Sequence, residues 1–164
     1  MLVMSDWVLK VSCAEQQLNV FSDNKLITRY AIATAAKGVG EQRNSEQTPR
    51  GSHIIRAKIG AHCKPNTVFV GRRPTGEYYT PSLKLQFPTR DWILTRILWL
   101  SGLEVGKNRL GLCDTMRRYI YIHGTPDDVV LGVPSSHGCI RMHNNDIIHL
   151  FDLVPVGTTV FISE

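Results

Sequence analysis

The chain has 164 residues, of which 43% are hydrophobic and 20% are charged, an ordinary composition for a globular protein with a buried core. We expect one domain over residues 1–164. The net charge of +5 would attract anionic partners, but the basic residues are dispersed, which argues against a nucleic-acid partner. The longest apolar run, residues 92–100, is too short to span a bilayer, so no membrane partner is expected.

The first part of the chain carries strand signals. Segments rich in β-forming residues lie at 7–11, 16–21 and 26–32, and the turn residues at 22–25 predict that they form a β-meander. A stretch of loop composition then covers 33–50, and an imperfect alternation of apolar and polar residues predicts another strand over 51–60.

Residues 61–91 contain four prolines and only a short apolar patch, which predicts a long irregular excursion. Residues 92–100 are ambiguous between helix and buried strand, and their β-branched and aromatic content favours a strand. A clear alternation predicts a strand over 118–122.

After residue 142, the polar residues 144–146 resemble a helix N-cap region, and the apolar face that follows predicts a helix ending near 155–157. Residues 158–162 predict a closing strand. The expected fold is therefore mainly β, with one or two short helices.

A cysteine motif, SHGCIRM at 136–142, is the strongest chemical signal in the chain. A thiol nucleophile needs a base or a positive charge nearby, because the thiolate is the attacking species. His123, at the end of a predicted strand, is the candidate base for Cys139, since the intervening glycines and prolines let the chain bend back. Gly138 would let backbone N–H groups near Cys139 form an oxyanion site, and Arg141 could bind a substrate carboxylate.

Other interpretations of these residues are open. Cys139 could be a small core residue, as expected of Cys13, Cys63 and Cys113, which are predicted to be free thiols without a catalytic role. A zinc site is a further alternative, although the spacing fits no common zinc motif and no metal is expected; its ligands would be His123, His137, Cys139 and His143. Arg141 could instead form a surface ion pair with Asp146.

The motifs together resemble the L,D-transpeptidase (YkuD-type) family. The matching segments are IHGT at 122–125, SHGCIRMHNND at 136–146 and TPRG at 48–51, and the likeness extends over most of residues 7–162. The resemblance implies an L,D-transpeptidase-like β-sandwich with the active site under a flap, one helix after the catalytic cysteine, and no cofactor.

The resemblance also implies roles for single residues. Cys139 would attack the carbonyl of an L-configured centre in a peptidoglycan stem tetrapeptide and expel the terminal D-alanine. His123 would be the base, oriented by the backbone carbonyl of Gly124. His137 and Gly138 would shape the oxyanion site, and substrate would be bound by Ser136, Arg141 and Asn144. A carbapenem adduct at Cys139 is also implied.

The acceptor of the acyl group is inferred from the N-terminus, where no signal peptide is recognisable. A cytoplasmic enzyme would meet soluble muropeptides, so we expect an L,D-carboxypeptidase of muropeptide recycling, with water as acceptor. The first alternative is a periplasmic L,D-transpeptidase whose export signal has been removed, which forms 3-3 crosslinks or exchanges D-amino acids. A less favoured alternative is a basic, non-catalytic binding module with an inert His-Cys loop.

Overall fold

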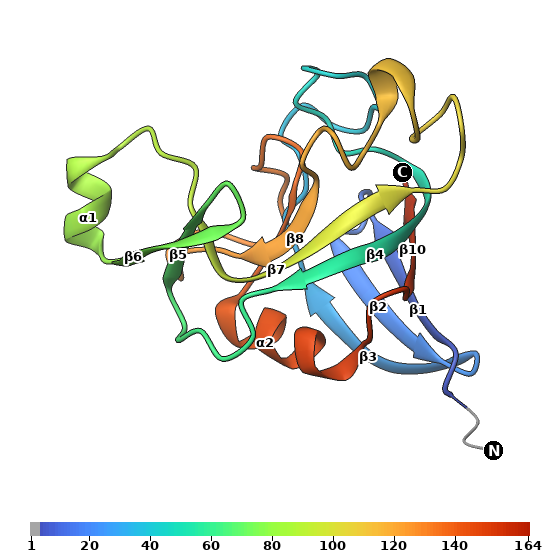
Figure 1. Ribbon diagram of the computed structural model, residues 1–164, viewed down its shortest axis with the longest axis horizontal. Coiled ribbons are helices and arrows are strands. Elements are labelled where there is room, and N and C mark those ends of the chain that lie inside the picture. Colours follow the sequence, from blue (N-terminus) through green and yellow to red (C-terminus); the bar gives the residue numbers. More distant parts are fainter. Residues whose placement is uncertain (1–3) are drawn as a thin grey trace.

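The computed structural model describes residues 4–164, which form one mixed sheet with two α-helices and a 3-10 turn (Figure 1). The elements in chain order are β1 Trp7–Ser12, β2 Gln17–Ser22, β3 Lys25–Ala31, β4 Gly51–Ile59, β5 Thr67–Val70, β6 Arg73–Tyr78, α1 Pro81–Gln86, β7 Ile93–Gly102, η1 Gly111–Cys113, β8 Tyr121–Gly124, β9 Ile140–Met142, α2 Asn144–Leu153 and β10 Thr159–Ser163. The predicted mainly β fold is confirmed. Within the described residues, no helix is long and apolar enough to cross a membrane.

The strands follow the order β3-β2-β1-β10-β4-β7-β5-β6, and β8 pairs with β7 on one side and β9 on the other. The predicted meander β1–β3 is antiparallel, as expected. The last strand, β10, lies parallel to β1 and antiparallel to β4, so it joins the meander to the central strands. β8 and β9 are also parallel, and this pairing positions the cysteine motif.

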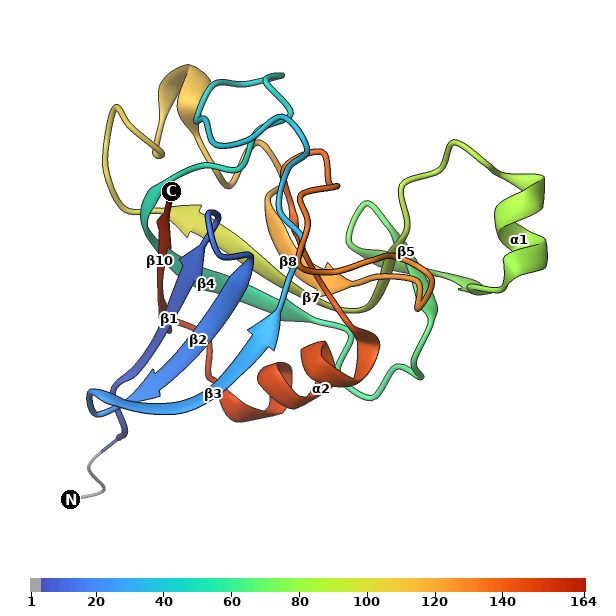
Figure 2. The ribbon, with the colours of Figure 1, turned by 180° about the vertical axis from the view of Figure 1, so that it is seen from behind.

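The sheet bends so that β1–β3 face the central strands, with α2 across one open end (Figures 1 and 2). Apolar side chains from the meander, from β4 and β7–β10, and from α2 meet in one cluster between these layers. Members that are 0% exposed include Leu9, Leu98, Ile122, Ile140 and Leu150. The apolar face predicted for residues 147–153 packs α2 into this core, as expected.

Leu98 offers a test of this core, because it is 0% exposed and joins β7 to the main cluster. Leu98→Ala should lower the free energy of unfolding by about 2–5 kcal/mol, since it deletes buried methyl groups and leaves a cavity. The matched control is Leu85→Ala on α1, where the side chain is 82% exposed and the change should stay within about 0.5 kcal/mol. Urea denaturation of both variants measures the difference; equal losses would contradict this packing.

The prediction of an irregular excursion over residues 61–91 is wrong. The segment forms the hairpin β5–β6 and the short helix α1, which project from the body of the molecule (Figure 1). Gly71 and Arg72 make the tight turn with positive φ angles of 56° and 64°. The prolines misled the prediction because each occupies a tolerated place: Pro74 lies in the edge strand β6, and Pro81 begins α1 after the capping residue Thr80.

The strand predicted over residues 118–122 begins only at Tyr121. Tyr119 has a φ of 55°, and its N–H donates to the carbonyl of Met116, so the chain is still turning at this point. The strand β9 was not predicted, because its pairing with β8 is not visible as a local pattern.

Candidate active site

The parallel pair β8–β9 brings the predicted base and nucleophile to one face of the sheet. Ile122 lies opposite Ile140, and both are buried in the main core. Since side chains alternate along a strand, His123 on β8 points to the other face, and Cys139, the residue just before β9, packs in an apolar cluster outside the main core. In the register of this pair His123 lies opposite Arg141, two residues beyond Cys139, so the predicted base and nucleophile are diagonal neighbours.

Cys139 borders a cavity of about 530 Å³ on this face. Its Sγ accepts a hydrogen bond from the N–H of Tyr121 at 3.3 Å and donates to the carbonyl of Tyr119 at 3.4 Å. Burial raises the pKa of the thiol to about 12, because the surrounding protein disfavours the charged thiolate. The resting group is therefore a neutral thiol that needs a base at the moment of attack.

His123 is 0% exposed and is held by its own backbone neighbour. Its Nδ1 donates to the carbonyl of Gly124 at 2.6 Å, which fixes the proton on Nδ1 because a carbonyl can only accept. Its Nε2 is buried and has no hydrogen-bond partner among the described residues. Burial lowers the pKa of His123, and the attraction of Asp91 opposes this only in part. The imidazole is thus neutral, with a free lone pair on Nε2.

The two side chains make no direct hydrogen bond in the described structure, because Sγ is engaged by the backbone of β8 and the preceding turn. A rotation of the Cys139 side chain away from the Tyr119 carbonyl would free the thiol proton for Nε2. Hydrogen bonds between catalytic side chains are often long or poorly aligned without substrate and shorten only when substrate binds.

The loop before Cys139 is held by internal hydrogen bonds. Ser136 Oγ donates to the carbonyl of Cys139 at 2.5 Å and accepts from the N–H of Gly138 at 3.1 Å. Thr48, in the TPRG turn, donates through Oγ1 to the carbonyl of Gly138 at 2.9 Å. In this conformation the N–H of Gly138 is thus taken up by Ser136. The roles predicted for Ser136 in substrate binding and for Gly138 in an oxyanion site stay predictions.

Gly138 must be glycine for two reasons. Its φ is +132°, and an added Cβ would lie 3.1 Å from Cδ1 of Ile120 and 3.3 Å from the carbonyl oxygen of Gln47. His137, next to it, is exposed and borders the Cys139 cavity and two neighbouring cavities. The imidazole of His137 is therefore placed at the entrance to Cys139, while its part in oxyanion stabilisation stays a prediction.

Gly124 and Asn144 belong to the support behind His123. An added Cβ on Gly124 would lie 2.4 Å from Oδ1 of Asn144 and 2.6 Å from the carbonyl oxygen of Leu94. Asn144 is buried; its Oδ1 accepts from Thr95 Oγ1 at 2.6 Å and its Nδ2 donates to Asn66 Oδ1 at 3.0 Å. Both ends of the amide are therefore used inside the protein, and the predicted contact of Asn144 with substrate stays a prediction.

Thr95, which donates to Asn144, lies in a bulge of β7 next to His123 and Gly124. It has a φ of 76°, a strained value for a β-branched residue. The register shift between Leu94 and Ile97 lets β7 pair with both Gly124 and His123. The hydrogen bond from Thr95 to Asn144 stabilises this bulge directly beside the predicted catalytic base.

Arg141 forms an ion pair, but not with the predicted partner. Its Nη2 lies 3.1 Å from Oδ1 of Asp91, and its Nη1 donates to the carbonyl and Oγ of Ser135 at 3.1 Å. The alternative pairing with Asp146 is wrong, because Asp146 lies in the first turn of α2 while Arg141 points to the other face of β9. The side chain of Arg141 is 14% exposed, so a substrate carboxylate would meet a guanidinium already shared with Asp91.

Two arginines that the sequence analysis did not assign also border the Cys139 cavity, Arg72 and Arg118. Arg72, at the turn of the β5–β6 hairpin, donates to the hydroxyl of Tyr121 at 3.1 Å. Arg118 donates to the carbonyl of Gln47 at 2.6 Å, and burial lowers its pKa. The adjacent arginines at 72 and 73 are visible in the sequence, but only the hairpin turn directs Arg72 to the site.

Among residues 4–164, no group of three or more His, Cys, Asp or Glu side chains is arranged to hold a metal ion. The four cysteines are free thiols, as predicted for Cys13, Cys63 and Cys113. Of the residues proposed for a zinc site, His123 already donates through Nδ1 to a carbonyl and His143 is exposed at the start of α2.

The chain is similar in sequence to known proteins over most of its length. The model of the L,D-transpeptidase catalytic domain family, YkuD, matches residues 6–162. YbiS of Escherichia coli K12, described as a probable L,D-transpeptidase, is 52% identical over 102 residues, which are 60% of this chain and 32% of YbiS. YkuD of Bacillus licheniformis is 28% identical over 155 residues, which are 94% of this chain and 64% of that protein.

Solved structures share the fold. L,D-transpeptidase 3 from Mycobacterium tuberculosis, in complex with a faropenem-derived adduct, has a TM-score of 0.59 at 16% identity. The superposition covers 98% of this chain and 61% of the L,D-transpeptidase 3 chain. LdtMt1 in complex with imipenem has a TM-score of 0.58 at 16% identity, and the superposition covers 97% of this chain and 59% of the LdtMt1 chain. The chain spans 24% of the length of YqjB of Bacillus subtilis and 32% of YbiS, so it corresponds to a part of these relatives.

Proposed function

The chain belongs to the YkuD family of L,D-transpeptidase catalytic domains, and from that premise we propose that it is a cysteine acyl-transfer enzyme that acts on peptidoglycan stem tetrapeptides. In this proposal it cleaves the bond to the terminal D-alanine and passes the acyl group to water, as an L,D-carboxypeptidase. The observation that carries the proposal is the buried, unpartnered Nε2 of His123 on the same face as Cys139.

The proposed reaction has two steps. The thiol of Cys139 attacks the carbonyl carbon of the L-centre while Nε2 of His123 takes its proton; the C–N bond breaks, and that proton goes to the amine of the leaving D-alanine. Water then gives a proton to His123 and attacks the thioester, and His123 returns the proton to the sulfur. The products are a tripeptide stem, free D-alanine and the starting enzyme.

The charges around the cavity suit such a substrate. Arg72 and Arg118 line the Cys139 cavity, and Asp91, the only carboxylate that lines it among the described residues, is paired with Arg141. A stem peptide carries several carboxylates, which arginine binds through paired N–H donors. The same cysteine would open the ring of a carbapenem and retain it as a thioester, by analogy with the structures of relatives that hold imipenem and a faropenem-derived adduct.

Product analysis tests the choice of acceptor. The purified protein, incubated with a tetrapeptide muropeptide, should release free D-alanine and a tripeptide muropeptide in equal amounts, measured by chromatography and mass spectrometry. Crosslinked dimers or exchange of an added D-amino acid, without tripeptide, would contradict hydrolysis and indicate a transpeptidase. The cytoplasmic recycling of muropeptides stays a prediction.

Acyl-enzyme formation also tests the alternative of a non-catalytic binding module with an inert His-Cys loop. A thioester with substrate requires the base as well as the thiol, so an inert loop would form none.

A further inference from the structure

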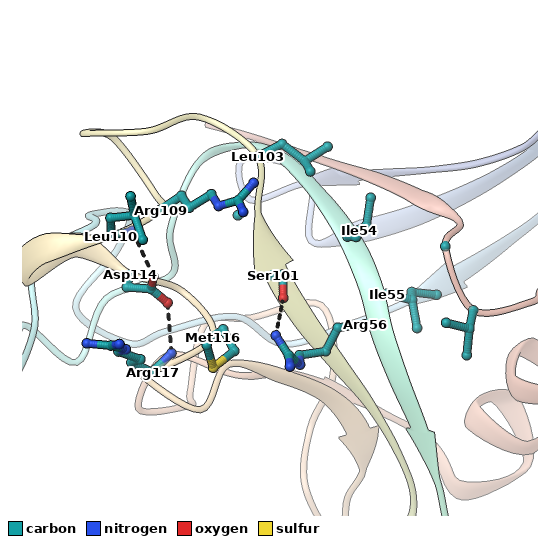
Figure 3. A pocket seen from close by; sticks show the side chains of 13 residues that line it. Ile54, Ile55, Arg56, Ser101, Leu103, Arg109, Leu110, Asp114, Met116 and Arg117 are labelled. Carbon is teal, nitrogen blue, oxygen red and sulfur yellow. Dashed lines mark hydrogen bonds between the residues drawn. The ribbon is translucent and has the colours of Figure 1, made fainter.

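A second cavity lies beside the one that contains Cys139. It has a volume of about 400 Å³ and is formed by β4, the end of β7, the loop over residues 109–117 and the turn before β10 (Figure 3). This volume lies within the range of small-molecule and peptide subsites. Its apolar wall is made by Ile54, Ile55, Leu103, Leu110, Met116 and Val156.

Three arginines, Arg56, Arg109 and Arg117, line this cavity and are exposed (Figure 3). Arg56 donates to Ser101 Oγ at 3.1 Å, whereas the guanidinium groups of Arg109 and Arg117 have neither an ion pair nor a hydrogen bond within residues 4–164. The cavity thus presents guanidinium donors that form no ion pair with a carboxylate of the described residues.

The one carboxylate in the lining, Asp114, is committed to the backbone. Its two oxygens accept from the N–H of Leu110 at 2.7 Å and of Arg117 at 3.0 Å. Burial opposes ionisation of Asp114, but the backbone hydrogen bonds and the attraction of the Arg117 guanidinium outweigh it and lower the pKa of this carboxyl. Asp114 therefore stabilises the shape of the loop that carries Arg109 and Arg117, and does not pair with their guanidinium groups.

The second cavity lies on the same face of the sheet as Cys139. On β7, Leu98 and Leu100 enter the main core, so Ile97, Trp99 and Ser101 point to the opposite face. Ile97 and Trp99 pack in the cluster that includes Cys139, and Ser101 lines the second cavity. The strand from Ile97 to Ser101 spans about 13 Å and runs from the cluster that includes Cys139 to the second cavity.

Trp99 forms the bridge between them. The guanidinium carbon of Arg72, from the Cys139 cavity, lies 4.8 Å from the centre of the indole ring, and that of Arg56, from the second cavity, lies 4.9 Å from it. The Trp99 Nε1 donates to the carbonyl of Met116 at 3.2 Å, which ties the ring to the wall of the second cavity. Arg72, Trp99 and Arg56 therefore form a continuous row of cationic and aromatic side chains between the two cavities.

We propose that the cavity lined by Arg56, Arg109 and Arg117 is a second subsite, which binds a carboxylate-bearing peptide stem adjacent to the stem that reacts at Cys139. The ligand class rests on the proposed function and on the lining: carboxylates meet the free guanidinium groups, and alanine methyl groups meet the apolar wall. A second stem on the same muropeptide chain or a separate stem would both present this chemistry.

A binding experiment with an unreactive probe tests the subsite apart from catalysis. The probe is the tripeptide stem, which has no terminal D-alanine to lose, titrated into isotopically labelled protein. We expect the methyl resonance of Met116 and the Nε–H resonances of Arg109 and Arg117 to shift with saturation. The triple variant Arg56→Gln, Arg109→Gln and Arg117→Gln should raise the Kd at these resonances about tenfold or more, which corresponds to at least 1.4 kcal/mol.

The matched control removes the same charge elsewhere. Lys10→Gln, Lys25→Gln and Arg29→Gln change exposed residues on the meander β1–β3 and should leave the Kd unchanged. Equal weakening in both triple variants would show a general charge effect and would overturn the proposal, as would shifts confined to Tyr119 and Tyr121. If the triple Gln variant does not fold, Arg109→Gln alone serves, since its side chain makes no hydrogen bond in the described structure.

The outcomes separate this inference from the proposed function. Shifts at Met116 with a protein that forms no acyl-enzyme would support the subsite and contradict the cysteine chemistry. An acyl-enzyme at Cys139 with no shift at Met116 or the two arginines would support the chemistry and overturn the subsite.

Discussion

Cys139→Ala should abolish the acyl-enzyme. When the unaltered protein is mixed with a stem tetrapeptide, its mass should increase by that of the peptide less D-alanine, and the variant should show no increase. Turnover should fall by about 10⁴-fold or more, because the residual hydrogen-bond donors of a site cannot replace its nucleophile. Mass spectrometry of the intact protein and release of D-alanine measure the two effects.

The matched control for this variant is Cys63→Ala. Cys63 packs in the same apolar cluster as Cys139, and its carbonyl, which accepts from Arg96, is retained in the variant. We expect its mass shift and turnover to equal those of the unaltered protein. An adduct that persists in Cys139→Ala would place the nucleophile elsewhere and reject the proposed mechanism.

His123→Gln should lower kcat by about 10²–10⁴-fold, the usual contribution of a positioned general base. Glutamine can still donate to the carbonyl of Gly124, but its amide takes up no proton near neutral pH. Since His123 is 0% exposed, thermal unfolding of the variant has to be followed beside its kinetics. The control His143→Gln changes an exposed imidazole at the start of α2 and should have little effect.

The pH profile distinguishes a base from a merely structural residue. Burial lowers the pKa of His123 below its ordinary 6.5, so the imidazole is already neutral at pH 7. The value of kcat/KM should therefore be level through neutral pH and fall only as the pH drops through the lowered pKa, where His123 takes up a proton. His123→Gln should lose this acid limb. A limb that persists unchanged in the variant would assign the titration to another group.

Much of the molecule follows from local sequence. The β-forming segments and turn residues in 7–32 predicted the meander, the apolar face after residue 146 predicted α2, and the motifs at 136–146 and 122–125 singled out Cys139 and His123. Local signals succeed in these places because each depends on a short stretch of chain: a period of two for a strand, an apolar face for a helix, and a compact motif for the cysteine chemistry.

Other features arose only when distant segments met. The hairpin β5–β6 was missed because its prolines look disruptive until Pro74 is seen on an edge strand. The partner of Arg141 proved to be Asp91, fifty residues away, since strand register decides which face a side chain occupies. The bulge at Thr95 likewise has no sequence signature, yet it sets how β7 meets His123 and Gly124.

By itself the sequence singled out the two residues to which we assign the chemistry in our proposal, Cys139 and His123, and it predicted the strand that leads to His123 and the helix that follows Cys139. The tertiary structure decided their electrostatic state and their surroundings. Burial makes both groups neutral, and the packing of the β5–β6 hairpin and of the 109–117 loop against one face of β7 gathers arginines around two adjoining cavities. The physical reason is that desolvation and charge neighbourhoods depend on contacts between segments far apart in the chain, which no local pattern records.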